Sequence, residues 1–227
     1  ANSKTMHWLD TVLSLPFSKT KESGLDFKKN KKKIQNTMKK FYDTLDEEIY
    51  GQKRAKTALM SAVSQMIINP DGASNRIALK GHSGVGKTSL LMALSKAFNR
   101  DIHFISLAGA TDASEIYGHG YTYESAKPGM IVEFLKKSGY NNPIIFFDEL
   151  DKASETAKGK EIVDLLLQMT DPIQNHKFRD KFVGDVDIDL SNVFFVFSYN
   201  DDKGVSQYLR SRINIQRLYD PQNLERV

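Results

Sequence analysis

The sequence contains no cysteine and no long hydrophobic run. Disulfide bonds and thiolate metal sites are therefore excluded. The longest apolar runs cover only residues 144–147 and 193–197, whereas a membrane-spanning helix needs about 20 apolar residues, so no membrane partner is expected. The chain begins with Ala1 rather than Met and shows no signal-peptide pattern. We expect an excised or processed piece of a longer protein, intracellular and cytoplasmic, with an organelle matrix as the alternative.

Charge is modest overall but uneven along the chain. The formal net charge is +4, yet nine lysines and only two acidic residues lie between positions 19 and 40. The rest of the chain is therefore net acidic, and a basic surface for nucleic acid is not indicated. We interpret the lysine-rich run at residues 28–40 as a solvated helix face, with contact to an acidic partner as the alternative.

Length and hydrophobic spacing favour one large domain with a small helical appendage. The 227 residues are 40% hydrophobic and 26% charged, which is typical of a globular protein. Apolar residues three or four positions apart predict two helices near the N-terminus, one ending at Leu15-Pro16 and one near residues 46–48. We therefore predict a helical linker segment over residues 1–48 and a main domain over residues 49–227.

The main domain alternates between helical and strand patterns. A helical stripe over residues 55–67 ends at the turn residues 69–72. Strands are predicted at residues 77–80, 102–107, 143–147, 193–198 and 213–218. Helices are predicted between them at residues 87–99, 129–139, 160–169 and 204–210. This alternation indicates an α/β fold in which a parallel five-stranded sheet lies between helices.

A glycine-rich loop follows the first of these strands and matches the P-loop pattern G-x-x-x-x-G-K-[ST]. Such glycines let backbone N–H groups approach phosphate oxygens closely, at the positive end of the next helix. We expect Lys87 to reach the β- and γ-phosphates and Thr88 to bind Mg²⁺. A chance glycine turn is the alternative, which the strand–loop–helix order disfavours. The loop comprises Gly81, His82, Ser83, Gly84, Val85, Gly86, Lys87 and Thr88.

Two adjacent carboxylates end the third predicted strand. Asp148 and Glu149 follow the apolar residues 144–147, and ligands of open parallel sheets lie at the carboxyl ends of the strands. Asp148 is expected in the Mg²⁺ shell, and Glu149 is expected to orient and polarise the attacking water. An acidic surface turn is the alternative. A glutamate at this position favours ATP hydrolysis over nucleotide binding alone.

Polar residues beyond the fourth strand extend the candidate site. Asn200 ends the segment Ser198-Tyr199-Asn200 and could touch the γ-phosphate or the water, with capping of the next turn as the alternative. Arg210, Arg212 and Arg217 follow. One of these arginines could act as an arginine finger, which stabilises charge on a transferring phosphoryl group; a surface salt bridge is the alternative for each.

Taken together, these motifs resemble AAA+ ATPases, and further segments resemble Lon proteases in particular. The P-loop, the stretch FDELDK at residues 147–152 and the SYN at residues 198–200 carry the first resemblance. The second covers nearly the whole chain, from about Trp8 to Tyr219. It rests on the segments at residues 8–17, 45–51, 105–109, 115–119, 121–123, 127–129 and 170–175.

The resemblance implies a function and further site residues. Lon proteases are ATP-dependent serine proteases that form hexameric rings and act on unfolded or misfolded proteins, with a Ser–Lys dyad in a separate C-terminal domain. By match, residues 49–227 are an AAA+ large subdomain that uses ATP and Mg²⁺. Asn200 is the sensor residue and Arg212 is the arginine finger. Tyr50 and Gly51 line the adenine pocket, and Tyr123 grips the substrate from a pore loop.

The chain also departs from the family pattern. His82 and Ser83 stand where the family usually has two prolines, Glu124 replaces an apolar residue, and residues 153–160 contain no aromatic residue. The chain ends at Val227, where a helical lid would start, and contains no protease motif. The alternatives are a stand-alone AAA+ remodelling ATPase without a protease and a nucleotide-dependent assembly scaffold that does not hydrolyse ATP.

Overall fold

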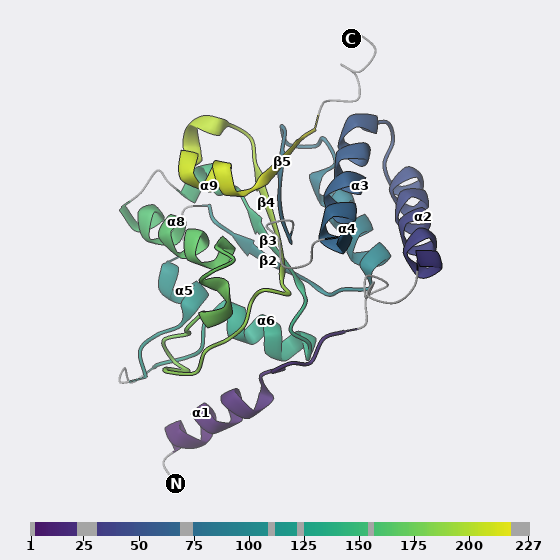
Figure 1. The fold of residues 1–227 in the computed structure, drawn as a ribbon. Coiled ribbons are helices and arrows are strands. Elements are labelled where there is room, and N and C mark those ends of the chain that lie inside the picture. Colours follow the sequence, from purple (N-terminus) through teal and green to yellow (C-terminus); the bar gives the residue numbers. More distant parts are fainter. Residues whose placement is uncertain are drawn as a thin grey trace.

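A parallel five-stranded sheet forms the centre of the molecule (Figure 1). The computed structural model describes residues 3–21, 31–68, 75–108, 112–121, 125–153 and 157–218. The strand order is β2-β3-β4-β1-β5, and every neighbouring pair is parallel. The prediction of such a sheet is therefore confirmed. The strands are β1 (Arg76–Lys80), β2 (Ile102–Ser106), β3 (Ile144–Asp148), β4 (Phe194–Tyr199) and β5 (Asn214–Arg217).

Helices cover both faces of the sheet and make a three-layered α/β/α arrangement (Figure 1). One face packs against α2 (Lys31–Glu48), α3 (Lys53–Ile68) and α4 (Lys87–Phe98). The other face packs against α5 (Ala113–Tyr117), α6 (Met130–Ser138), α7 (Leu150–Ala153), α8 (Ala157–Thr170) and α9 (Gln207–Arg212). The helix α1 (Ser3–Ser14) lies below the sheet in this view.

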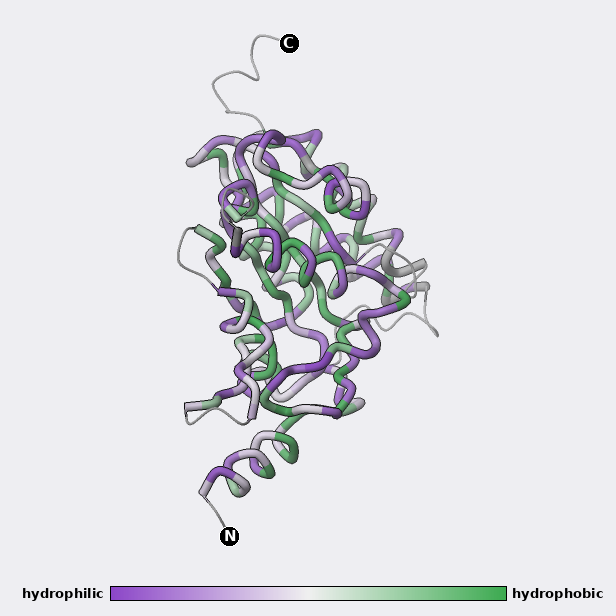
Figure 2. The backbone as a smooth tube through the Cα atoms, turned by 90° about the vertical axis from the view of Figure 1, so that its left-hand side faces the viewer, coloured by the Kyte–Doolittle hydropathy of each residue, from purple (hydrophilic) through white to green (hydrophobic). Residues whose placement is uncertain are grey.

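The central strands are apolar on both sides because each of their faces is covered. In β3, Ile145 and Phe147 join the cluster under α6 and α8, whereas Ile144 and Phe146 join the cluster under α4. Figure 2 shows the hydrophobic colour concentrated along these inner strands and weaker on the outer helices. Two-sided burial explains why these strands read as continuous apolar runs.

Strand register decides which residues emerge at the carboxyl edge of the sheet. Lys80 of β1 is paired with Tyr199 of β4, and Phe147 of β3 is paired with Phe197. The chain therefore leaves β1, β3 and β4 at nearly the same level. The P-loop, the carboxylates that follow β3 and the residues after Tyr199 all start from this edge.

The segment before α2 is fastened to the core at two places. Trp8 of α1 donates its indole N–H to the carbonyl oxygen of Val183 at 3.0 Å. Farther along, the Asn141 N–H donates to the Lys19 carbonyl at 2.8 Å, and Asn142 exchanges two hydrogen bonds with the Lys21 backbone. The first contact ties α1 to the segment between α8 and β4, and the second ties residues 19–21 to the loop between α6 and β3.

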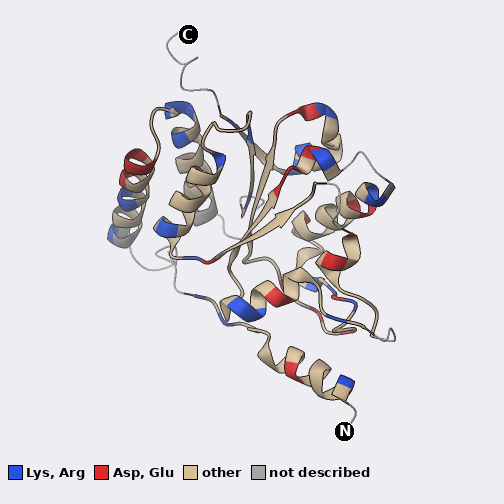
Figure 3. Cartoon of the chain, turned by 180° about the vertical axis from the view of Figure 1, so that it is seen from behind, with Lys and Arg blue, Asp and Glu red and all other residues tan. Residues whose placement is uncertain are grey.

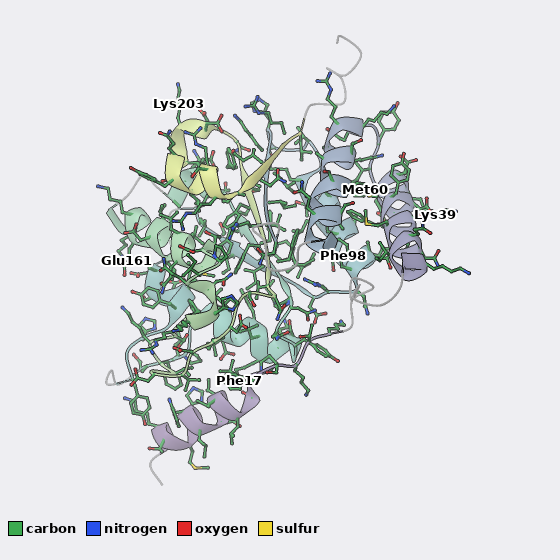
Figure 4. The ribbon with its side chains drawn as sticks, in the orientation of Figure 1. Phe17, Lys39, Met60, Phe98, Glu161 and Lys203 are labelled. Carbon is green, nitrogen blue, oxygen red and sulfur yellow. The ribbon has the colours of Figure 1, made fainter. Side chains whose placement is uncertain are left out.

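The helix α2 also contributes to the core. Phe41 is fully buried, and its ring centroid lies 5.1 Å from that of Phe98 in α4. Figure 4 shows Phe98 among α2, α3 and α4, while Lys39 extends away from the molecule. Lysines gather at the start of α2 and acidic residues at its end (Figure 3). A domain boundary at residue 48 stays a prediction, since α2 and α4 share one hydrophobic cluster.

Most predicted elements agree with the structure to within a few residues, but one helix was misplaced. A helix was predicted at residues 204–210, whereas the chain first makes a 3-10 turn at Asp202–Gly204 and then forms α9 at Gln207–Arg212. The Asp201 carboxylate accepts the Lys203 N–H at 3.1 Å and stabilises that turn. The short helices α5 and α7 were not predicted, because four or five residues give no periodicity. Within the described ranges, no helix has the length and apolar character needed to cross a membrane.

Candidate functional site

The P-loop joins β1 to α4, as the sequence predicted. Gly84 and Gly86 have φ angles of 85° and 95°, which favour glycine. Gly81 is needed for a different reason: a Cβ at this position would lie 2.9 Å from the Leu218 carbonyl oxygen. Its own N–H donates to the Tyr199 carbonyl at 3.1 Å, which ties the loop to β4. The loop therefore presents the N-terminus of α4 at the sheet edge, a favourable place for an anion.

Lys87 is the first residue of α4, and its side chain turns back over the loop. Its ammonium group donates to the carbonyl oxygens of Gly81 and His82 and to the side-chain oxygen of Asn200, at 2.8 Å for the last. Burial lowers the pKa of Lys87, and the carboxylates Asp148, Asp151 and Glu149 act in the opposite direction. The cation and the amide proposed as sensor are thus direct neighbours.

Asp148 ends β3, and β4 helps to orient its carboxylate. Its Oδ1 atom accepts a hydrogen bond from the Ser198 hydroxyl and another from the Glu149 N–H, the latter at 3.0 Å. Both bonds use the same oxygen. The Asp148 side chain also borders the cavity described below, as expected of a metal ligand at this edge.

Glu149 has an unusual backbone conformation. Its φ angle of 59° lies in the left-handed region, which costs a residue with a side chain about 1 kcal/mol. The surroundings compensate, because the Glu149 N–H donates to Asp148 Oδ1 and weakly to the Ser198 hydroxyl at 3.4 Å. Both Glu149 and Asp148 border the cavity described below.

Several of the predicted residues border one cavity of about 380 Å³ beyond the carboxyl ends of β3 and β4. The P-loop side supplies Lys87 and Thr88, and the strand side supplies Asp148, Glu149 and Asn200. Carboxylate and hydroxyl oxygens suit Mg²⁺, which completes its shell with water and phosphate. The donor set therefore fits a magnesium nucleotide. The remaining lining residues are Ser83, Gly84, Gly86, Ser89, Phe146, Ser198 and Tyr199.

Tyr50 and Gly51 lie in the turn between α2 and α3 and do not border this cavity. Tyr50 is 89% exposed, and Gly51 has a φ angle of 66°. The next residue, Gln52, is buried and donates from its side chain to the Val85 carbonyl of the P-loop at 3.4 Å. Gln52 therefore connects this turn to the P-loop by a hydrogen bond. The proposed role of Tyr50 and Gly51 in an adenine pocket stays a prediction.

Arg212 lies at the end of α9, away from the lining of the cavity. Its guanidinium donates to the Leu167 carbonyl at 3.1 Å and to the Asp171 carboxylate at 3.4 Å. The Arg212 side chain is 41% exposed, so it remains accessible from outside. The Nη1 atom of Arg210 lies 3.9 Å from a carboxylate oxygen of Asp202. Tyr123, the predicted pore-loop residue, lies outside the described residues.

Sequence reasoning missed three side chains that support the site. Gln52 contacts the P-loop, Ser198 orients Asp148, and Asp151 accepts the N–H groups of Asn200 and Asp201 at 3.2 and 3.3 Å. Ser198 and Asp151 belong to segments that the sequence had singled out. The only indication of their roles in the sequence was that Ser198 lies two residues before Asn200 and Asp151 two residues after Glu149. Hydrogen bonds between residues far apart in the chain leave no periodic pattern in the sequence.

The site belongs to a P-loop nucleotide-binding protein. Its defining features are a strand, a glycine loop and a helix in that order, with a lysine and two carboxylates at the same edge of the sheet. Residues 77–220 match the family described as "ATPase family associated with various cellular activities (AAA)". The match covers more than half of the chain, from β1 past β5. The chain belongs to the AAA family of ATPases.

Individual relatives narrow the likeness to Lon proteases. The chain is 34% identical over 226 residues to the Lon protease of Fusobacterium nucleatum, a match covering 100% of this chain and 28% of that protein. It is 37% identical over 216 residues to the mitochondrial Lon protease homolog of Yarrowia lipolytica, covering 94% and 17%. A Lon protease homolog of Acanthamoeba polyphaga mimivirus is 37% identical over 186 residues, covering 82% and 18%. The chain spans less than a third of the length of each of these relatives.

Proposed function

We propose that this chain is the ATP-hydrolysing module of a Lon-type protease and that it drives unfolding and translocation of protein substrates. The observation that carries the proposal is the convergence of Lys87, Asp148, Glu149 and Asn200 on one cavity at the carboxyl edge of the sheet. A P-loop alone would support nucleotide binding. The glutamate beside the magnesium-type aspartate adds the group that hydrolysis requires.

Each residue has a distinct task in the proposed reaction. Backbone N–H groups of the P-loop and the Lys87 ammonium bind the phosphates and balance their charge. Thr88 and Asp148 would hold Mg²⁺, which when bound neutralises charge on the β- and γ-phosphate oxygens. Glu149 orients the attacking water and polarises it, and Asn200 offers an amide to the water or the γ-phosphate. Positioning and electrostatics account for most of the acceleration.

The proposed assembly is a homo-hexamer in which Arg212 of one subunit completes the site of its neighbour. Two observations support this. Among the described residues that border the cavity, Lys87 is the cation. Arg212 does not border the cavity of its own subunit, and its side chain is 41% exposed. The mass of the intact protein with ATP, measured by light scattering, tests the proposal, and a monomer at every concentration would contradict it.

The proposed substrates are unfolded or misfolded proteins, gripped by Tyr123. An aromatic side chain offers apolar area to any passing chain without requiring a sequence motif. Tyr123→Ala in the intact protein should keep ATPase activity and lose processing of a folded reporter protein. Normal processing by this variant would remove Tyr123 from the mechanism.

Phosphate release from ATP by the intact protein, with and without Mg²⁺, tests the central proposal. We expect turnover only with Mg²⁺. Tight ATP binding without turnover would instead favour an assembly scaffold. Unfolding of a reporter without cleavage would favour a remodelling ATPase that lacks a protease, and release of peptides would support the Lon-type serine protease.

A further inference from the structure

Asp151 lies two residues after Glu149, in the short helix α7, and is buried. Only 5% of the residue is exposed. Its Oδ2 atom accepts the backbone N–H of Asn200 at 3.2 Å and that of Asp201 at 3.3 Å. A single carboxylate oxygen therefore holds the two residues by which the chain leaves β4.

The N–H groups of Asn200 and Asp201 lie past the last residue pairs of the sheet. The last pair between β4 and β1 joins Tyr199 to Lys80, and the last pair between β4 and β3 joins Phe197 to Phe147. Asn200 and Asp201 follow both pairs, so no strand fixes their direction. A backbone N–H that leaves a sheet needs another acceptor. Asp151 is that acceptor for both residues.

A second contact fixes the far end of the same loop. The carbonyl oxygen of Asp151 lies so close to Gly204 that a Cβ at residue 204 would be 2.2 Å from it. The loop at residues 200–204 thus rests on Asp151 at its beginning and at its end. Because α7 begins immediately after Glu149, the loop and the proposed catalytic glutamate share one support.

The burial of Asp151 exceeds what a simple turn cap requires. Asp189 caps a turn by accepting the Ser191 N–H at 2.8 Å, but its side chain is 52% exposed to water. Asp151 keeps its Oδ1 atom buried without a hydrogen-bond partner among the described residues. Burying a carboxylate in this way is unfavourable. The Lys87 ammonium is a nearby opposite charge, since the negative charge of Asp151 is one of three that raise the pKa of Lys87.

We propose that Asp151 is a positioning residue that holds Asn200 in place against Lys87. Asn200 Oδ1 lies 2.8 Å from Lys87 Nζ, and Asp151 fixes the backbone from which that amide projects. Asp151 acts through Asn200 and does not itself border the cavity. This inference rests on the proposed ATPase function and adds a residue to its machinery.

Steady-state ATPase kinetics of the intact protein test the inference with four variants: Asp151→Ala, Asp151→Asn, Asn200→Ala and the double alanine variant. Asp151→Ala should lower kcat about a hundredfold, the usual consequence of misplacing a catalytic group by about 1 Å. KM should stay within about threefold, because Lys87 and the P-loop remain. Asp151→Asn keeps an acceptor oxygen and should fall between wild type and Asp151→Ala.

The double variant separates positioning from an independent effect. If Asp151 acts through Asn200, adding Asp151→Ala to Asn200→Ala should cost little more, within about threefold. A simple loss of stability would instead lower the two activities independently, so that the losses multiply. Asp189→Ala is the control: it removes a turn-capping carboxylate and its contact with His176, neither of which borders the cavity, and its kcat should equal that of wild type.

Several results would overturn the inference. One is a kcat of Asp151→Ala within about threefold of wild type, and another is multiplication of the two losses in the double variant. Should Asp151→Ala fail to fold, Asp151→Leu decides, because leucine fills a similar volume without an acceptor oxygen: unchanged kcat refutes positioning, and reduced kcat with unchanged KM supports it. Failure of the proposed function looks different, because wild type itself would then release no phosphate.

Discussion

The ammonium group of Lys87 lies 2.8 Å from the side-chain oxygen of Asn200, although 113 positions separate the two residues in the chain. Parallel neighbouring strands explain this contact, since β1 leads into the P-loop and β4 leads into Asn200 at the same edge of the sheet. A phosphate group bound by Lys87 therefore lies next to the proposed sensor.

Lys87→Ala should abolish binding of ATP with Mg²⁺, because the charge of the phosphates would lose its principal side-chain partner. Titration calorimetry measures the affinity directly. Lys96→Ala is a suitable control: Lys96 lies on the same helix but is exposed and paired with Glu48. We expect unchanged affinity in the control. Equal affinity of Lys87→Ala and wild type would show that nucleotide binds elsewhere.

Glu149→Gln should bind ATP and leave it unhydrolysed. Glutamine preserves the size of the side chain and its hydrogen bonding, including the backbone bonds that support the φ angle of 59°, but it cannot polarise water as a carboxylate does. Quenched-flow analysis of bound nucleotide should find ATP rather than ADP. Turnover within about threefold of wild type, less than about 1 kcal/mol of barrier, would assign the base to another residue.

Arg212→Ala should leave ATP binding nearly intact and lower turnover by about a thousandfold if Arg212 serves the neighbouring subunit. The contacts of Arg212 with Leu167 and Asp171 hold it on the outside of its own subunit. Mixing Glu149→Gln with Arg212→Ala subunits tests this directly. Some interfaces would then combine an intact Glu149 with an intact Arg212, and ATPase activity should partly return.

A dilution series of wild type provides the control for the mixing experiment. Specific activity should fall as the assembly dissociates, because the site depends on two subunits. A rate independent of concentration would contradict the shared site. So would the absence of recovery at every mixing ratio, provided that exchange of subunits is demonstrated by a labelled partner.

Asp180 should make stability depend on pH. The residue is fully buried, and burial raises its pKa to about 6, even though three backbone N–H groups bond its carboxylate. Between pH 3.8 and about 6 the folded state keeps a proton that the unfolded chain has released. The unfolding free energy contributed by this group therefore falls as pH rises through that window and is level above about pH 7.

Urea unfolding of wild type and Asp180→Asn at several pH values measures this contribution. Asparagine does not titrate, so wild type should lose stability relative to the variant between pH 4 and 7, by about 1 to 3 kcal/mol. Asp43→Asn, at an exposed position of α2, should follow wild type over the same range. Parallel curves for wild type and Asp180→Asn would show that Asp180 does not change its protonation in this window.

The sequence predicted the sheet and the P-loop because both depend on local patterns. Apolar runs such as residues 193–197 indicate buried strands wherever they occur, and glycines before Lys87 and Thr88 indicate a phosphate loop. Asp148 and Glu149 could also be assigned, since the end of a buried strand must lie at the edge where ligands bind.

Other parts of the site depend on contacts between distant segments. No pattern within the sequence indicates that Asp151 accepts the N–H groups of Asn200 and Asp201, or that Ser198 orients Asp148. The misplaced helix at residues 204–210 has the same origin. Gly204 must pass against the carbonyl of Asp151, so the chain turns there and the helix starts three residues later.

The attachment of the N-terminal segment has a mechanical consequence. Residues 19–21 are bonded to Asn141 and Asn142, directly before Ile144 begins β3, and the opposite end of β3 carries Asp148. A displacement of α1 would therefore reach the start of β3 through residues 19–21, in addition to the segment at Val183, to which Trp8 is bonded. Along that strand the distance from the point of loading to the proposed catalytic carboxylates is only about 15 Å. The attachment of the N-terminal segment and the proposed catalytic carboxylates therefore lie at opposite ends of the same strand.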